Sequence, residues 1–192
     1  MKPIRTILLR MRRRALALRG NNSGVAAVEF AMIIPLMAAM LLGTNEFATG
    51  VAIDRKVTIM ARTLSDLTSQ NTEVTDAKLT NFFNAGKSIM TPYPSTPVQG
   101  TITELYINPT TLKARVQWSQ GSAPHAAGDI IDIPDALKIG GTYLISEVKY
   151  KYVPSVAWFL NKANGITLSD ISYTRPRQGI CVLYLTDVCE TK

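Results

Sequence analysis

Residues 24–44 read GVAAVEFAMIIPLMAAMLLGT, and this stretch decides how the rest of the chain is interpreted. Glu29 is the only charged residue among the 20 residues from Val25 to Thr44. A helix rises about 1.5 Å per residue, so a helix of this length spans roughly 30 Å, the thickness of the hydrocarbon core of a bilayer. Pro35 removes one backbone donor, and we expect a bend there rather than an end of the helix. The stretch predicts one membrane-spanning helix.

Positive charge is concentrated directly before this stretch. Seven of the 21 Lys and Arg residues precede Glu29, and the other 14 equal the 14 Asp and Glu residues in number. The seven basic residues are Lys2, Arg5, Arg10, Arg12, Arg13, Arg14 and Arg19. A basic flank keeps its side of a span in the cytoplasm. We therefore expect a cytoplasmic N-terminus and a periplasmic body, and the charge balance of that body argues against nucleic acid as a partner.

Other N-terminal signals fit this pattern less well. A secretory signal peptide carries its cleavage site after a shorter apolar region. Here the polar residues 20–24 come before the apolar run. An uncleaved signal anchor would fit the run itself, but a carboxylate inside an apolar span costs a few kcal/mol and usually marks function. Glu29 therefore favours a functional segment over a plain anchor.

The string GVAAVEF, Gly24 to Phe30, resembles the prepilin peptidase site of type IV pilins and pseudopilins. The resemblance implies cleavage between Gly24 and Val25 by a membrane aspartyl peptidase, and it marks Glu29 and Phe30 as the recognition and assembly residues. Cleavage would create an amino group at Val25, about 6 Å along the helix from Glu29. The carboxylate of a neighbouring subunit would neutralise this amine, which offsets the cost of two charges in lipid and fixes the subunit register.

Three stretches together are similar to TadE-like proteins, minor pseudopilins of the tight-adherence (Flp-type IV) pilus system: Gly24–Phe30, Ala61–Leu67 and Tyr150–Pro154. Removing residues 1–24 leaves 168 of the 192 residues, far more than the short major pilin of that system. The resemblance implies a minor subunit of a type IVb tight-adherence pilus in the bacterial inner membrane. Its partners would be prepilin peptidase, other pilins and pseudopilins, the inner-membrane assembly platform and membrane lipid. The alternative is an uncleaved, single-span periplasmic binding or scaffold protein.

The helical pattern continues beyond the span. Apolar residues recur at helical spacing in one stripe, formed by Ile53, Val57, Met60, Leu64 and Leu67. We expect a basic leader at 1–24, a span at 25–44, a helical continuation at 45–90 and an antiparallel sheet head at 91–192. The expected class is α+β, with the long helix packed on a small sheet in the lollipop form of pilin subunits.

A second helix and several strands are expected in the body. Thr75 predicts the N-cap of a helix that ends near Ser88 and buries Leu79, Phe82 and Phe83, and the Pro-rich residues 91–97 form a connector. Alternation of polar and apolar residues predicts strands at 100–107, 112–119 and 143–153, and a last strand at 179–185. In the second strand we expect Leu112, Ala114, Val116 and Trp118 on one buried face.

The two cysteines, Cys181 and Cys189, are compatible with a local disulfide or with two reduced thiols. A periplasmic location favours the disulfide. The stretch from Val153 to Leu160 is apolar, and it fits either the core or an exposed contact patch.

No set of residues in the sequence predicts catalysis or a cofactor. The single histidine, His125, lies in a Gly- and Ala-rich loop, where we expect a solvated side chain rather than a general base. The cysteines stand far from it in sequence, which argues against zinc. Asp129, Asp132 and Asp135 recur every third residue and could collect calcium, but Pro134 and the intervening isoleucines favour a solvated turn. We expect a structural protein and not an enzyme.

Overall fold

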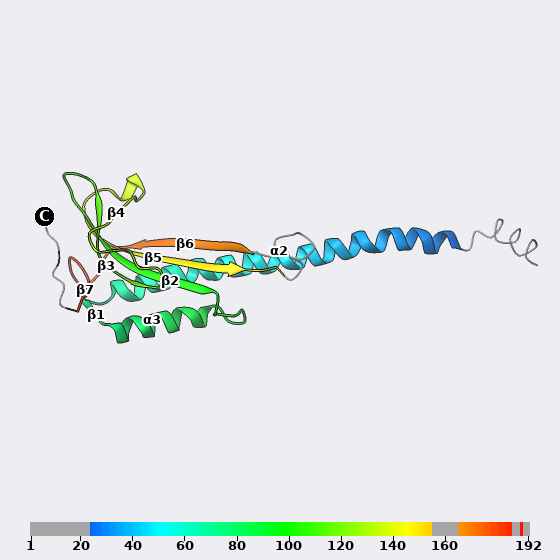
Figure 1. Ribbon diagram of the computed structural model, residues 1–192, viewed down its shortest axis with the longest axis horizontal. Helices are drawn as coiled ribbons and strands as arrows, with labels where there is room; N and C mark the ends of the chain where they lie inside the picture. The colour runs from blue at the N-terminus through cyan, green and yellow to red at the C-terminus, as the bar shows by residue number, and fades with distance from the viewer. Residues whose placement is uncertain (1–23, 155–164, 186–188, 190–192) are drawn as a thin grey trace, which may run out of the picture. The chain divides into compact units, whose positions relative to one another are not determined.

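The computed structural model describes residues 24–154, 165–185 and 189 (Figure 1). The elements in chain order are α2 (Val25–Ser69), β1 (Glu73–Val74), α3 (Asp76–Ile89), β2 (Val98–Ile107), β3 (Ala114–Gly121), β4 (Ile130–Ile131), the 3-10 helix η2 (Asp135–Leu137), β5 (Gly141–Tyr152), β6 (Ile166–Thr174) and β7 (Leu183–Tyr184). This confirms the α+β class with a long N-terminal helix packed on an antiparallel sheet. The expected leader, apart from Gly24, and most of the apolar stretch 153–160 lie outside the described residues.

The chain divides into two compact units, one ending at Asn45 and the other beginning at Glu46. In the described part of the first unit, every residue of α2 is exposed. The helix passes through Pro35 without ending, as expected. By length and composition α2 can cross a membrane, and it fits a single-pass anchor.

The second unit, here called the head, begins with the continuation of α2. Ile53, Val57, Met60 and Leu64 are each at most 2% exposed, which confirms the predicted stripe, whereas Leu67 is half-buried. Arg55 and Arg62 lie on the solvent side. The stripe buries one side of α2 in a core that it shares with α3 and the sheet.

Helix α3 begins where the sequence predicts. The hydroxyl of Thr75 accepts a hydrogen bond of 3.4 Å from the backbone N–H of Lys78, as an N-cap does. Gly86 allows α3 to approach α2 closely. A Cβ at this position would lie 3.0 Å from Met60 Cε and 3.2 Å from Leu64 Cδ2.

The main sheet has five antiparallel strands in the order β4-β3-β2-β5-β6 (Figure 1). Because side chains alternate across a strand, the sheet contributes to a core on each face. Ile102, Trp118 and Val148 belong to the core formed with α2 and α3. Leu105, Val116 and Ile145 belong to a second core, which includes Ile133.

Strand β3 differs from its prediction. Its pairing with β2 shifts between Glu104, opposite Trp118, and Leu105, opposite Val116, so Gln117 is the extra residue of a bulge. The bulge reverses the alternation, and Trp118 therefore joins the core on the helix side whereas Val116 joins the other. The expectation of one shared face was wrong. Leu112 precedes the strand, at φ 56°, and is exposed.

The C-terminal part also differs from its prediction. Strand β6, which was not predicted from the sequence, pairs with β5 from Leu144 to Tyr152. The last strand is only Leu183–Tyr184, and it pairs in parallel with β1 rather than with the main sheet. Cys181 lies before this strand and not within it.

Candidate functional site

The predicted processing and assembly residues lie at the start of α2. Val25 is the first residue of the helix, and Gly24 directly precedes it. No atom lies within 4 Å of the position that a Cβ on Gly24 would take. Val25 is 50% exposed and Phe30 63% exposed, and Glu29 is exposed in the second turn. The Gly24–Val25 peptide bond is therefore sterically open and sits at the boundary of the helix.

Glu29 stands alone among apolar neighbours. From Val25 to Asn45 no other side chain of α2 carries a charge. A carboxylate in such a surface is stable in lipid only when it is neutralised or paired with a cation. An ammonium group from another chain can supply that pair, so this geometry suits pairing between subunits.

Glu46, the next acidic residue after Glu29, was not singled out from the sequence. Its carboxylate accepts a hydrogen bond of 2.5 Å from the hydroxyl of Tyr152 at the end of β5. Burial, and then the hydrogen bond to Glu46, raise the pKa of Tyr152 to about 12. The Tyr152 ring also packs beside Gly50, where an added Cβ would lie 3.7 Å from it. These contacts attach the first turns of α2 in the head to the end of β5.

Two buried side chains of the sheet, Glu104 and Trp118, bind the backbone of the C-terminal segment. The N–H of Val182 donates to Glu104 Oε1 at 2.6 Å, and Trp118 Nε1 donates to the carbonyl of Val182 at 2.8 Å. Glu104 is 2% exposed and Trp118 4% exposed. The Trp118 ring stacks on Tyr184 with centroids 5.6 Å apart. Glu104 is the only charged residue of β2, and that was the sequence signal for this contact.

The same segment carries the two cysteines. Cys181 and Cys189 are joined in a disulfide, with Cα atoms 5.8 Å apart. Upstream of it, the N–H of Arg177 donates to the carbonyl of Ser69 at 2.9 Å, and its guanidinium pairs with Asp66. The segment is thus bound both to the sheet and to the end of α2.

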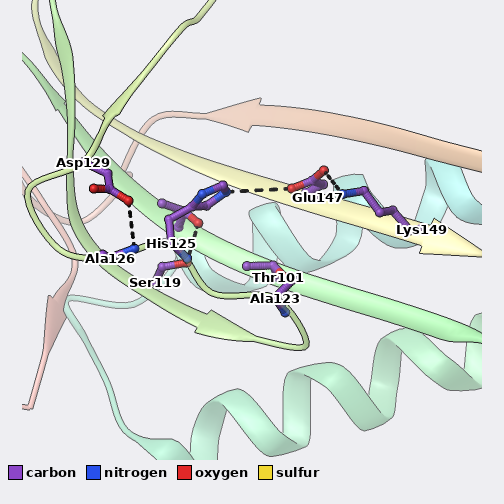
Figure 2. A network of polar contacts seen from close by, with 9 residues as sticks. Thr101, Ser119, Ala123, His125, Ala126, Asp129, Glu147 and Lys149 are labelled. Atoms are coloured by element: carbon purple, nitrogen blue, oxygen red, sulfur yellow. Dashed lines mark hydrogen bonds and ion pairs between the residues drawn. The ribbon is translucent and has the colours of Figure 1, made fainter.

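The loop that carries His125 folds back on the sheet, as Figure 2 shows. The N–H of His125 donates to Ser119 Oγ at 3.1 Å, and the N–H of Ala123 donates to Thr101 Oγ1 at 3.2 Å. The imidazole Nε2 lies 3.9 Å from Glu147, whose carboxylate also pairs with Lys149 at 2.7 Å. The ring is partly exposed, as expected, but the loop backbone is held in place. Ser119 is contacted by the backbone of His125 and not by its ring.

The aspartates considered for calcium are engaged in other contacts. The ammonium of Lys138 lies 3.2 Å from Asp132 and 2.8 Å from Asp135. Its hydrogen bond lowers the pKa of Asp135, and the hydrogen bond to Asp135 raises the pKa of Lys138. Asp129 instead accepts from the N–H of Ala126 at 3.2 Å. Among the described residues, no group of three His, Cys, Asp or Glu side chains is placed to hold a metal ion.

Comparison with known proteins bears on the N-terminal segment. Residues 24–63 match the family model described as TadE-like protein. The match contains Gly24, Val25, Glu29 and Phe30 and ends within the part of α2 that packs in the head. No curated protein and no solved structure matches the chain. Residues 24–63 are therefore similar to TadE-like proteins, which confirms the suspected resemblance to that family for this part of the chain.

Proposed function

We propose that the protein is a minor pilin-like subunit, processed after Gly24, that takes part in assembly of a type IVb tight-adherence pilus. One observation carries this proposal. A single carboxylate, Glu29, lies in the exposed apolar part of α2, five residues after the glycine that precedes it, inside the TadE-like segment. An apolar helix gains nothing from this charge unless a partner pairs with it.

The first step is processing. Prepilin peptidase cuts the Gly24–Val25 bond on the cytoplasmic side of the inner membrane and releases residues 1–24. The open surroundings of Gly24 support this step, because a peptidase must bring its two catalytic carboxylates against the backbone. The cut leaves a new α-amino group at the first residue of α2.

The second step is pairing between subunits. Val25 and Glu29 of one subunit lie about 6 Å apart along the helix axis, so a neighbouring subunit shifted by that distance brings its Glu29 beside the amine of Val25. Each charge alone costs about 2.5–3.5 kcal/mol in the middle of a membrane. The pair removes most of this cost and favours one register, because a slip by one turn separates the two charges again.

The remaining features support a periplasmic head with a structural role. The basic residues before Glu29 favour a cytoplasmic N-terminus. The Cys181–Cys189 disulfide suits an oxidising compartment. In the described part of the head, the His125 ring faces Glu147, and Ser119 Oγ is bound by the backbone of His125. A serine hydrolase would need the histidine ring against a serine hydroxyl.

The proposal is tested with Glu29→Gln, which keeps the size of the side chain but removes its charge. We expect processing to continue, because the peptidase acts before subunits pair, and incorporation into pili to fall on the order of 100-fold, since an unpaired amine in lipid costs about 2.5–3.5 kcal/mol. The matched control is Asp54→Asn, an exposed acidic residue on the same helix, which should leave incorporation unchanged. The readouts are the mass of the membrane-bound subunit and the amount that sediments with sheared pili. Normal incorporation of Glu29→Gln would remove the proposed role of Glu29.

A further inference from the structure

A cavity opens at the end of the sheet where β2 and β6 finish and β5 begins (Figure 1). Residues from the end of β2, from the start of β5 and from the segment after β6 line it. Its volume is about 510 Å³, which falls within the range of roughly 300–1,000 Å³ that ligand pockets occupy. It is here called the end cavity.

The end cavity holds one charged group. Among the described residues that line it, only Arg175 carries a charge. The guanidinium donates a hydrogen bond to the hydroxyl of Tyr143, and its Cζ lies 4.8 Å from the centroid of the Tyr143 ring. Tyr143 is 5% exposed and belongs to the second core. These contacts hold the guanidinium in place before a ligand binds, which lowers the entropy cost of binding.

Nearby cations have acidic partners, whereas Arg175 has an aromatic one. Arg177 pairs with Asp66, and the ammonium of Lys138 pairs with two aspartates. In the part of the chain that the structure describes, Arg175 forms no ion pair. A guanidinium has five N–H donors in a planar fork that matches a carboxylate. With one donor used on Tyr143, the remaining donors of Arg175 can bind an anion in the cavity.

Large apolar side chains surround this charge. Ile139 is 67% exposed and Ile180 69% exposed, and both line the cavity together with Pro109. Gly140, at φ 80°, brings the two walls together, because a Cβ on it would lie only 3.1 Å from the Cβ of Pro109. Exposed isoleucines at the rim of a cavity are apolar surface that a partner can bury.

We propose that the end cavity binds an acidic side chain of another polypeptide, flanked there by large apolar residues. The carboxylate pairs with Arg175 by charge-assisted hydrogen bonds, and the apolar neighbours cover Ile139 and Ile180. A free phosphate or a sugar acid would satisfy Arg175 but would leave both isoleucines in water. The combination of one fixed cation with an apolar rim therefore favours a peptide. Binding here involves the head alone and requires no processing after Gly24.

The test follows the δ1 methyl groups of isoleucine by NMR in the full-length protein in dodecyl maltoside micelles. The probe is acetyl-Leu-Glu-Leu-amide, and its control is acetyl-Leu-Gln-Leu-amide, which lacks only the charge. The methyl groups of Ile139 and Ile180 should shift with the acidic peptide, whereas that of Ile171, 45% exposed on β6 and outside the cavity, should not. The uncharged peptide should bind on the order of 10-fold more weakly, because charge-assisted hydrogen bonds are roughly twice as strong as neutral ones.

A pair of arginine variants tests the assigned residue. Arg175→Gln should weaken binding of the acidic peptide by a similar factor of about 10. The matched control is Arg177→Gln, two residues further along the chain and paired with Asp66, which should bind the peptide as the original protein does. The methyl signal of Ile171 reports whether each variant is folded, and the two peptides test the charge on the unmodified protein.

Four results would overturn the proposal. The methyl groups of Ile139 and Ile180 do not shift, the two peptides bind equally, or Arg175→Gln binds the acidic peptide unchanged. The fourth is binding by another occupant. Inorganic phosphate or galacturonate that binds as tightly as the acidic peptide would show a simple anion site, and shifts of the same methyl groups on dilution of the protein alone would show a second copy of this chain.

Discussion

The hydroxyl of Tyr152 donates a hydrogen bond of 2.5 Å to the carboxylate of Glu46, and this bond joins β5 to α2 at the first residue of the head. The two residues are 106 positions apart in sequence. The bond therefore fixes where the sheet sits along the part of α2 that belongs to the head.

Tyr152→Phe removes the hydroxyl that makes this bond and keeps the aromatic ring. We expect the free energy of unfolding to fall by about 1 kcal/mol, the usual net contribution of one hydrogen bond. Denaturant unfolding of the detergent-solubilised protein measures it. Tyr93→Phe is the control, because Tyr93 packs against the same core and its described contacts include no side-chain hydrogen bond. Equal losses in both variants would contradict the role given to the bond.

The same tyrosine predicts a pH dependence. In the unfolded chain Tyr152 ionises near its ordinary pKa of 10, whereas in the folded protein its pKa is about 12. The unfolded state thus loses its proton first, and stability present below pH 10 is lost as the pH rises toward 12. Tyr152→Phe should flatten this decline. Some decline remains, because burial also raises the pKa of Tyr150 and Tyr173. The free energy of unfolding is measured for both proteins from pH 9 to 12. An equally steep decline in both proteins would contradict this prediction.

Trp118→Phe should weaken the attachment of the C-terminal segment. The carbonyl of Val182 loses its buried donor, which costs about 1–3 kcal/mol. Ring volume lost beside Tyr184 adds to this cost. Hydrogen exchange at residues 181–185 should rise more than exchange in β5. Replacing Glu104 by Gln, which keeps an oxygen acceptor for the N–H of Val182, should cost less than Glu104→Leu.

Loss of the disulfide should destabilise the head without abolishing its fold. The Cys181–Cys189 bond closes a loop with a sequence separation of 8. Closing so short a loop contributes about 2.5 kcal/mol by the chain-entropy model. The double variant Cys181→Ser with Cys189→Ser should lose about this amount and keep its circular dichroism spectrum. Loss of the β signal would show that the bond is needed for the sheet itself.

Much of the fold follows from local sequence pattern. The stripe from Ile53 to Leu64 has helical spacing, and Thr75 caps a helix that buries Leu79, so both helices were predictable. The turn after β2 was also predictable, because Asn108 Oδ1 accepts from the N–H of Thr110 and of Thr111 at 2.9 Å.

The missed features depend on residues far apart in sequence. The bulge at Gln117 appears only when β3 is aligned with β2, and it decides which core Trp118 enters. Strand β6 was missed because Asp170 and Ser172 occupy its centre, so its pairing with β5 outweighs a weak apolar pattern. Tyr152 and Glu46 carry no local sign of their contact. At the N-terminus, by contrast, the whole candidate site is contiguous, so GVAAVEF could be compared directly with the prepilin peptidase site, and it lies within the segment that matches the TadE-like family model.

The most direct test of the central proposal is the mass of the membrane-extracted protein from cells with and without prepilin peptidase. We expect a chain of 168 residues beginning at Val25 when the peptidase is present, and the full 192 residues when it is absent. Gly24→Val should block the cut, whereas Gly20→Val, a glycine in the same leader, should allow it. An intact Met1 in both kinds of cell would contradict the account.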